Sequence, residues 1–245
     1  MKTILIGCTL FCALMLPPLD ALACSSVTEG RLEDYYGDIN GKYKIQMTLV
    51  FKADAVDGEY FYHSQRKDIA LKGTKRGTES IVLDELDAAG KAVARFEGAL
   101  TSDCDTIKGT WQKSGASEKL TFSLRMRGSH SGRLDDRYGI AGGGPDDVVH
   151  ANATTFWQAV KMGDKKTVAA TIAYPVRAQV KGKKRHFPNA KAFLASYDAI
   201  FTPAFREAVV NSVPHNMSAD SQGIMLGDTG EVWLNHEGKV KAINN

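Results

Sequence analysis

The sequence predicts two domains of different class, an all-β antiparallel meander barrel followed by an α+β domain shaped like a cone. Three observations lead to this prediction. Residues from about 30 to 128 form short alternating runs separated by glycine-rich turns, which is typical of an all-β domain. Residues 129–147 are rich in glycine and poor in apolar side chains, as expected for a linker between domains. From residue 148 onward, apolar residues recur at helical spacing and are followed by further short strands.

The N-terminal residues predict export from the cell. Met1-Lys2 gives a basic start, Thr3–Leu16 is an uninterrupted apolar run, and Ala21-Leu22-Ala23 is a cleavage motif with small residues at its ends. The apolar run is shorter than the about 20 residues that a membrane-spanning helix needs. We therefore expect a signal peptide over residues 1–23, and a mature chain in the periplasm with no membrane span.

Two cysteines remain in the mature chain, Cys24 and Cys104. An even pair in an exported protein predicts a disulfide, which would tie the N-terminus to the loop around Cys104. A cysteine directly after the cleavage site also allows a lipid anchor at Cys24, with Cys104 then a free thiol. The order of Ala21 and Leu22 before Cys24 departs from the usual lipoprotein signal and favours the disulfide.

The first domain, expected over residues 24–128, contains seven or eight short strands that follow one another directly. Consecutive strands of this number favour an antiparallel meander, which removes its exposed edges by closing on itself. We interpret Asp57-Gly58 as a turn that precedes one of them. The expected strands are Tyr35–Asp38, Lys42–Lys52, Glu59–Ser64, Asp68–Lys72, Ser80–Asp87, Ala92–Leu100, Thr106–Gln112 and Lys119–Arg127.

Alternation within these strands indicates which side chains face the interior. In Lys42–Lys52 every second residue is apolar, so we expect those residues inside the barrel, and Gln46 and Thr48 outside it. Gly98 and Gly109 lie at similar positions of two neighbouring strands. Glycine weakens a strand unless the strand bends sharply, so these positions predict the corners of a small, tightly curved barrel.

The second domain is expected over residues 148–245, with its first helix starting just before it. Asp146 or Asp147 is suited to cap a helix that runs to about Met162, and Gly163-Asp164 separates it from a second short helix. The remaining expected elements are a strand at Tyr174–Val180, helices at Ala190–Phe201 and Ala204–Val210, and strands at Gly223–Leu226, Glu231–Asn235 and Lys239–Ile243.

A series of motifs characterises the second half: Phe156-Trp157, Gly163-Asp164, Tyr174-Pro175, Asn189-Ala190, Tyr197-Asp198, Gly223–Gly227 and Gly230–Trp233. With these motifs, the second half resembles the cone-shaped α+β domains similar to nuclear transport factor two that occur in exported bacterial proteins. The resemblance implies a curved sheet around a pocket behind the helices; some members of that superfamily are enzymes and many only bind, and none of their catalytic residues can be placed on this sequence. The first half is similar to lipocalin-like or avidin-like barrels in pattern only, which implies no ligand.

No catalytic, metal or cofactor site is predicted. The histidines form no H-x-H or H-x-x-x-H pair, and the sequence lacks the G-x-S-x-G turn of a serine hydrolase. The candidate ligand-binding residues are two groups of aromatic and acidic side chains. In each group the alternative is that the side chains only fill a core. The candidates are Tyr60, Tyr62 and Trp111 inside the barrel, and Tyr197, Glu231 and Trp233 in the cone.

Because the sequence offers no convincing catalytic set, binding is the leading function class. The net charge of +3 is small, and basic and acidic residues are interspersed, which argues against nucleic acid as a partner. The function predicted is a non-enzymatic periplasmic binding protein, most concretely an inhibitor or immunity-type protein acting on a cell-wall hydrolase or a toxin. The basic cluster Lys181–Arg185 is a candidate contact surface. The alternatives are a carrier of a small apolar ligand, using the barrel or the cone, and an enzyme in the cone domain.

Overall fold

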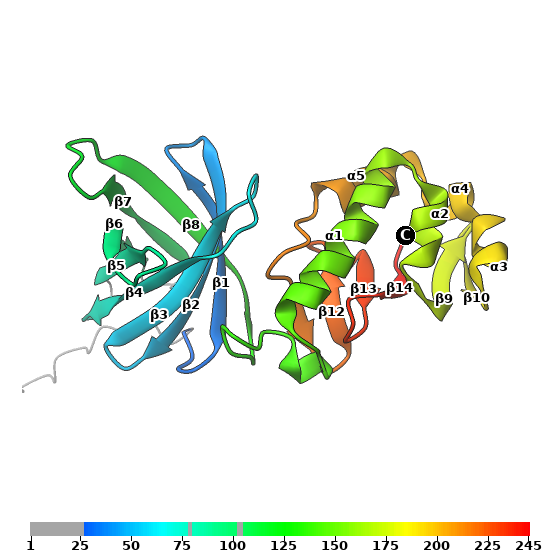
Figure 1. The fold of residues 1–245 in the computed structure, drawn as a ribbon, viewed down its shortest axis with the longest axis horizontal. Helices are drawn as coiled ribbons and strands as arrows, with labels where there is room; N and C mark the ends of the chain where they lie inside the picture. Colours follow the sequence, from blue (N-terminus) through cyan, green and yellow to red (C-terminus); the bar gives the residue numbers. More distant parts are fainter. Residues whose placement is uncertain (1–26, 78–79, 102–104) are drawn as a thin grey trace, which may run out of the picture.

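The computed structural model describes residues 27–245, apart from 78–79 and 102–104. A closed barrel of eight antiparallel strands is followed by a smaller α+β domain with its own sheet, which confirms the predicted fold class. The two domains lie side by side along the longest axis of the molecule (Figure 1). The expected signal peptide and both cysteines of the predicted disulfide lie outside the described residues.

The barrel is a meander in which each strand pairs with the next and β1 closes the ring by pairing with β8. Seven of its strands begin or end within a few residues of the predicted positions, and β1 extends the expected short strand at both ends. Their bounds are β1 Leu32–Ile39, β2 Tyr43–Lys52, β3 Ala55–Tyr62, β4 Ile69–Arg76, β5 Ser80–Leu86, β6 Ala92–Leu100, β7 Thr106–Lys113 and β8 Leu120–His130.

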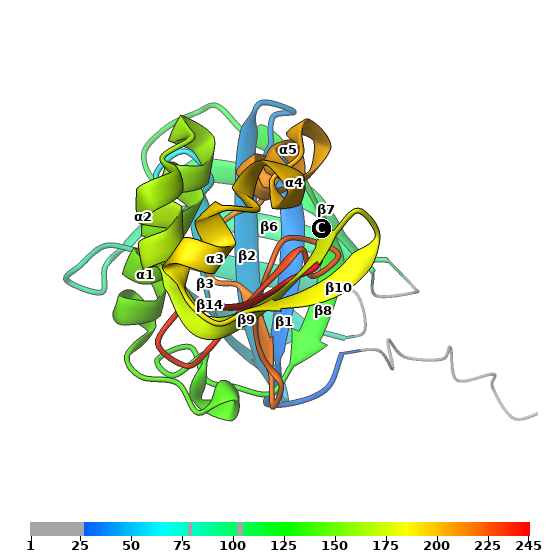
Figure 2. The same cartoon turned by 90° about the vertical axis from the view of Figure 1, so that its right-hand side faces the viewer.

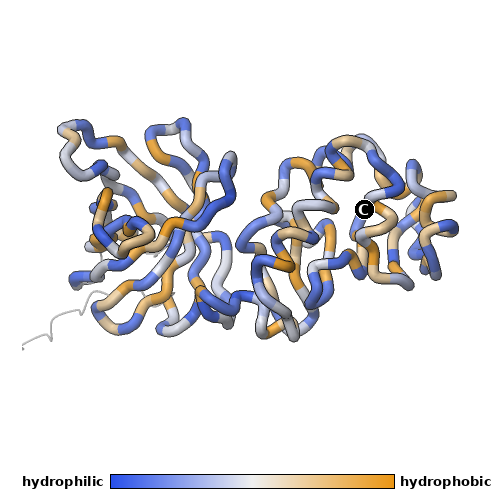
Figure 3. Tube along the Cα trace, viewed as in Figure 1, coloured by the Kyte–Doolittle hydropathy of each residue, from blue (hydrophilic) through white to orange (hydrophobic). Residues whose placement is uncertain are grey.

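Apolar side chains fill the interior of the barrel. Apolar and polar residues alternate along several of its strands (Figure 3), as expected where one face of a strand is turned to a core. Gly98 and Gly109 pair directly across β6 and β7, and a β-carbon added at Gly109 would lie 2.0 Å from the carbonyl oxygen of Glu97. These two glycines therefore permit a close approach of β6 and β7, and their predicted role at a tight curve stays a prediction. The buried interior residues are Tyr35, Ile39, Ile45, Met47, Leu49, Phe51, Val56, Tyr60, Leu71, Ile81, Leu83, Phe96, Leu100, Ile107, Phe122 and Leu124.

The prediction of a turn at Asp57-Gly58 is wrong. Both residues lie inside β3, where Gly58 pairs with Leu49 of β2. The chain reverses earlier, between Lys52 and Ala55, where Ala53 has a positive φ of 52°. A β-carbon at Gly58 would lie 2.6 Å from the carbonyl oxygen of Thr48, so this glycine permits a close approach of two strands.

The second domain has a six-stranded sheet in the order β10-β9-β14-β13-β12-β11. All neighbouring strands are antiparallel except β14 and β9, which are parallel. The expected sheet lacked β10 and β11: β10 consists mainly of exposed basic residues without alternation, and β11 is very short. The strands are β9 Ile172–Val180, β10 Lys183–Phe187, β11 Ser218–Asp220, β12 Gly223–Leu226, β13 Val232–Leu234 and β14 Val240–Ile243.

Five helices pack on this sheet, and Figure 2 shows α3, α4 and α5 on one side of the curved β9 and β10. Asp164 caps α2 as predicted, by accepting a hydrogen bond from the Thr167 backbone amide. The prediction of a single helix over Ala190–Phe201 is wrong, because α3 ends at Leu194 and α4 begins at Tyr197. The helices are α1 Asp146–Met162, α2 Lys165–Ala170, α3 Ala190–Leu194, α4 Tyr197–Ile200 and α5 Pro203–Asn211.

Candidate functional site

Two buried side chains anchor the segment that joins the domains. Residues 131–145 connect β8 to α1 and include the short 3-10 helix Gly139–Ala141. Arg137 and Tyr138 in this segment are 1% and 0% exposed. The glycine-rich composition suggested a simple tether, but the middle of the segment is part of the packed contact between the two domains.

Arg137 binds groups from both domains. Its Nε donates to the carbonyl oxygen of Met217 at 2.9 Å, and its Nη1 donates to Thr48 Oγ1 at 3.2 Å. Its Nη2 forms an ion pair with Asp34, whose other carboxylate oxygen accepts from Thr48 Oγ1 at 2.7 Å. Removal of one partner from a buried ion pair leaves an uncompensated charge, so this contact is costly to break.

Asp34 is ionised in these surroundings. Burial alone would raise the pKa of its carboxyl group, but Arg137 and His130 hold that pKa below its usual range. His130 Nε2 lies 3.0 Å from Asp34 Oδ2 and 3.1 Å from Arg137 Nη2. The charged pair therefore fixes the connecting segment against β1 and β2 at neutral pH.

A second set of polar contacts joins the barrel to the segment before β11. The side-chain amide of Asn216 donates to Glu59 Oε1 at 2.8 Å and to Asp68 Oδ1 at 3.0 Å. His215 Nε2 lies 2.9 and 3.0 Å from the two oxygens of Asp68, and Gln46 Nε2 donates to the Asn216 carbonyl oxygen at 2.8 Å. These barrel residues point away from the lumen, as alternation predicted for Gln46, but the second domain covers them.

Glu59 is the most perturbed carboxyl group at this contact. Burial raises its pKa to about 7, and the nearby negative charge of Asp68 acts in the same direction. The side chain lines a cavity of about 620 Å³ on the barrel surface, whose lining residues include no histidine, serine, threonine, tyrosine or cysteine. Glu59 can therefore exchange a proton near neutral pH, but no hydroxyl, thiol or imidazole side chain lines that cavity with it.

Tyr138 and His150 extend these contacts into the second domain. His150 Nε2 accepts from the Asn216 backbone amide at 3.1 Å and lies 2.9 Å from the Tyr138 hydroxyl, which accepts from the Met217 amide at 3.0 Å. Burial, followed by the neighbouring His215, lowers the pKa of His150 to about 3. The imidazole is therefore neutral and serves as a hydrogen-bond acceptor.

We call this set of contacts the interdomain polar network. Because its groups are nearly all buried and hydrogen-bonded to one another, it holds the two domains in one arrangement. The network consists of Asp34, Gln46, Thr48, Glu59, Asp68, His130, Arg137, Tyr138, His150, His215 and Asn216.

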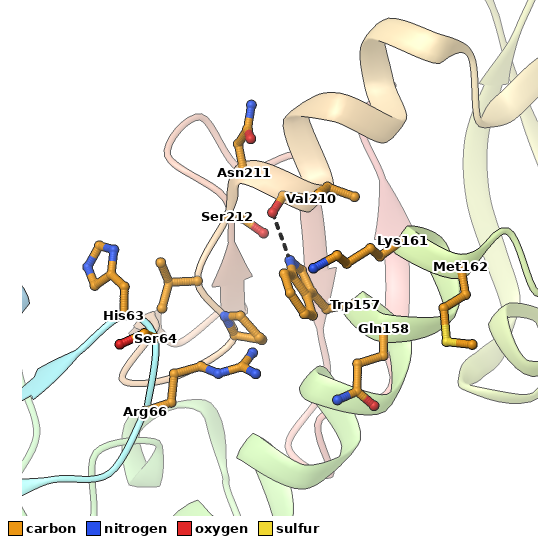
Figure 4. A pocket seen from close by; sticks show the side chains of 12 residues that line it. His63, Ser64, Arg66, Trp157, Gln158, Lys161, Met162, Val210, Asn211 and Ser212 are labelled. Atoms are coloured by element: carbon orange, nitrogen blue, oxygen red, sulfur yellow. Dashed lines mark hydrogen bonds between the residues drawn. The ribbon is translucent and has the colours of Figure 1, made fainter. Parts of the chain in front are cut away.

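A groove runs beside this network along the contact between the two domains, which we call the seam. Two adjoining cavities of about 820 Å³ and about 740 Å³ share His63, Asn211, Ser212 and Val213 in their lining, so they form one continuous depression. We call it the interdomain groove, and Figure 4 shows its first part. None of the residues of the polar network lines it. The groove is therefore free for a partner while the network holds its two walls.

Trp157 of α1 forms the aromatic floor of the first part of the groove. Its indole Nε1 donates to the Val210 carbonyl oxygen at 3.1 Å, which fixes the ring (Figure 4). The guanidinium carbon of Arg66, from the loop between β3 and β4, lies 4.9 Å from the ring centroid, and Lys161 Nζ lies 5.0 Å from it. Each domain thus places one cation over the same ring.

The lining of the groove is predominantly basic. Among the residues that the structure describes, no carboxylate lies within 4.0 Å of the charged nitrogens of Arg66, Lys161 or Arg125. Arg127 is paired with Asp228, which is the single acidic residue among those that line the two cavities. The groove therefore carries excess positive charge that no side chain of the described chain neutralises.

The structure brings together the three candidates of the barrel, although in a packed setting. Tyr60 Oη donates to Glu85 Oε2 at 2.7 Å, and Trp111 Nε1 donates to the same oxygen at 3.2 Å. The rings of Tyr60 and Tyr62 lie 5.5 Å apart, and Phe96 packs on Tyr60 at 5.2 Å. Tyr60 is fully buried in the core and Tyr62 and Trp111 pack against that core, so these side chains fill one end of the barrel.

The three candidates of the second domain do not line one common cavity among those described. Tyr197 is buried in the core and stacks on Phe201 with ring centroids 4.6 Å apart. Glu231 precedes β13 and accepts hydrogen bonds from Thr229 within the adjacent turn. Trp233 lines a shallow surface cavity of about 270 Å³ beside β8. Helix and strand side chains fill the space between the helices and the sheet, where the resemblance implied a pocket.

Sequence patterns missed the residues of the groove for different reasons. Trp157 and Lys161 share a helix face by their spacing, but Trp157 also fits the apolar pattern of the buried face of α1. Arg66 lies in a loop and has no local signal that relates it to α1. Only the packing of the two domains brings these side chains together.

Comparison with known proteins gives no family assignment. No protein-family model matches the chain, and a search of curated proteins finds no significant match. Within residues 27–77, 80–101 and 105–245, no helix is long and apolar enough to cross a membrane. No group of three or more metal-ligating side chains suited to a metal ion occurs in that same part of the chain.

Proposed function

We propose that the protein is a non-enzymatic binding protein of the inhibitor or immunity type, whose partner is another protein that docks into the interdomain groove. The observation that carries this proposal is the groove itself, a basic, aromatic-floored depression whose two walls come from different domains. Because the polar network already holds the walls, the groove needs no large rearrangement to accept a partner, which favours tight association.

The interiors of both domains are packed with side chains, which favours docking of a partner at the surface over transport of a small ligand. Large apolar side chains occupy the barrel, and Tyr60, which a hollow barrel would offer to a ligand, is 1% exposed. The space behind the helices of the second domain is filled in the same way. A carrier of a small apolar ligand would need one of these interiors to open.

The chemistry of the buried groups gives less support to an enzyme. The imidazoles of His150 and His215 and the carboxylate of Asp68 are hydrogen-bonded within the polar network and line none of the cavities at the seam. A catalytic base needs access to a reacting atom, and these groups are directed at one another. Glu59 has a suitable pKa, but the cavity it lines contains no hydroxyl, thiol or imidazole group to act as its partner.

The cellular setting of the proposal follows from the N-terminal residues. A signal peptide over residues 1–23 would deliver the chain to the periplasm, where cell-wall hydrolases and incoming toxins act. The likeness of the second domain to proteins similar to nuclear transport factor two fits a binding role as well, because many such domains only bind. Both statements stay predictions from the sequence.

Photo-crosslinking in the producing organism tests the proposal. Met162 lines the groove and is 82% exposed, so a photoreactive amino acid at this position would contact a docked partner. Lys184, exposed on β10, is the matched control on the far end of the second domain. We expect one discrete protein adduct at position 162 that is absent at position 184.

The captured protein must then respond to binding. We expect that equimolar addition of the purified protein abolishes the hydrolase or toxin activity of the captured partner. Adducts of equal yield at both positions, or a captured protein whose activity does not change, would contradict the proposed function.

A further inference from the structure

We infer that the interdomain groove is an anion-recognition site and that its occupant is an acidic protein segment, whose carboxylates pair with Arg66, Lys161 and Arg125. This inference rests on the proposed function and specifies the chemistry of the partner. Three features of the groove carry it: the orientation of Trp157, the position of Arg66, and the distribution of unpaired charge.

The first part of the groove is organised before any ligand arrives. The hydrogen bond from Trp157 Nε1 to the Val210 carbonyl oxygen ties the ring to the end of α5. The guanidinium carbon of Arg66 and Nζ of Lys161 lie 4.9 and 5.0 Å from the centroid of this ring. These contacts limit the conformations of two otherwise flexible side chains. Cations that are already ordered lose less entropy when they bind a carboxylate.

Arg66 reaches the groove from an uncommon backbone conformation. Its φ is +52°, in the left-handed region that non-glycine residues seldom adopt. Its amide donates to the carbonyl oxygen of Tyr62 at 2.8 Å, so a tight turn at the end of β3 holds it there. This turn directs a barrel arginine across the seam to a tryptophan of the second domain. Unfavourable backbone conformations of this kind are concentrated at functional sites.

The charge continues along the second part of the groove. Arg125 and Arg127 project from β8, and only Arg127 has a carboxylate partner, Asp228. His63 lies between the two parts and lines both. Burial lowers the pKa of His63, so at neutral pH its ring adds a polar surface without adding charge. The cations are therefore divided between the two ends of the groove, which suits an elongated polyanion.

The basic hairpin around Lys181–Arg185 is the alternative surface for an acidic partner. Its residues are exposed, and β10 is an edge strand of the sheet. Lysines on an edge strand commonly serve to prevent pairing with other chains, which explains this cluster without a ligand. None of the cavities described above is lined by these residues, and no aromatic ring holds their side chains. The groove is therefore the better candidate for the surface that binds an acidic partner.

Titration with a fluorescein-labelled hexaglutamate peptide, measured by anisotropy at low ionic strength, tests the inference on the full mature chain. We expect binding that weakens steeply with added salt. The double variant Arg66→Gln and Lys161→Gln should weaken it by about tenfold, because two charge-assisted contacts are lost. The control variant Lys183→Gln and Lys184→Gln removes the same charge from the hairpin and should change affinity less than about twofold.

The outcomes separate the possible errors. Equal weakening by both double variants, loss confined to the hairpin variant, or tighter binding of a sulfated glycan than of the peptide would overturn the inference. Failure of the proposed function is recognised independently. If no protein adduct forms at position 162 while the peptide still binds at Arg66 and Lys161, the groove binds anions but is not the docking site of a protein partner. If the captured partner binds the Arg66→Gln and Lys161→Gln variant normally, the protein does bind a partner, but Arg66 and Lys161 do not recognise it.

Discussion

Arg137 shows how a single residue determines the relation between the domains. It belongs to neither regular sheet, yet its guanidinium reaches Asp34 and Thr48 of the barrel and the backbone of Met217 in the second domain. Because the whole side chain is buried, the groups it binds would be left without partners if it were shortened. This residue makes the stability of the seam sensitive to one substitution.

We expect Arg137→Met to lower the free energy of unfolding by about 3–5 kcal/mol, because it leaves Asp34 charged and buried. Chemical denaturation followed by fluorescence measures the change. Adding Asp34→Asn to this variant should restore part of the loss. The exposed Arg133→Met, on the same segment, is the control and should change stability by no more than about 0.5 kcal/mol. Equal effects of the two single arginine variants would contradict the role of Arg137.

Glu59 gives the seam a dependence on pH. Its pKa in the folded protein is about 7, above the ordinary value of 4.5. Between these two values the folded state binds more protons than the unfolded state, so stability falls as pH rises through this window and levels off above it. The unmodified protein should lose about 3–4 kcal/mol of stability across this window, at about 1.4 kcal/mol per pKa unit, and we expect Glu59→Gln to remove that loss.

The measurement is the difference in unfolding free energy between Glu59→Gln and the unmodified protein at several pH values. Taking this difference cancels the contribution of His150, whose lowered pKa acts in the opposite sense by reducing stability as pH falls below about 6.5. The exposed Glu118→Gln serves as the control for the removal of a carboxylate from the surface. A difference for Glu59→Gln that stays constant with pH would show that burial of Glu59 is less than the structure indicates.

At the scale of the elements, glycines within strands let neighbouring strands of the barrel approach closely. We expect Gly109→Ala to destabilise the protein by more than about 2 kcal/mol, since its β-carbon would meet the carbonyl oxygen of Glu97 at 2.0 Å and the backbone must shift. Gly144→Ala, with no atom within 4 Å of the added carbon, is the matched control. A thermal unfolding midpoint for Gly109→Ala that equals that of Gly144→Ala would exclude this role of the glycine.

The sequence is informative about elements whose signals are local. Alternation in β2 correctly predicts that Ile45 and Met47 lie inside the barrel, and Gly163-Asp164 marks the end of α1 and the cap of α2. The turn predicted at Asp57-Gly58 was wrong because Asp-Gly is typical of turns. The sequence alone does not distinguish such a turn from a strand in which glycine permits close approach of a neighbouring strand. The outward faces of Gln46 and Thr48 were predicted, but their burial was not, because alternation cannot reveal a second domain that covers the barrel.

At the scale of the whole molecule, the seam joins two domains that each have their own core. A polar network of this kind links their unfolding, and we expect one cooperative thermal transition for the intact protein. In Arg137→Met the link is weakened, so calorimetry should resolve two transitions, one for each domain. A single transition in this variant would mean that the apolar contacts at the seam suffice to couple the domains.

We propose that the fixed contact between the two domains serves to present the interdomain groove to a partner. The most direct measurement is the affinity of the protein captured at position 162 for the Arg66→Gln and Lys161→Gln variant, compared with the unmodified chain by calorimetric titration. We predict a loss of about tenfold or more in affinity with an unchanged unfolding midpoint, because both side chains lie at the surface of the groove. An unchanged affinity, with binding lost instead in the Lys183→Gln and Lys184→Gln variant, would contradict the claim.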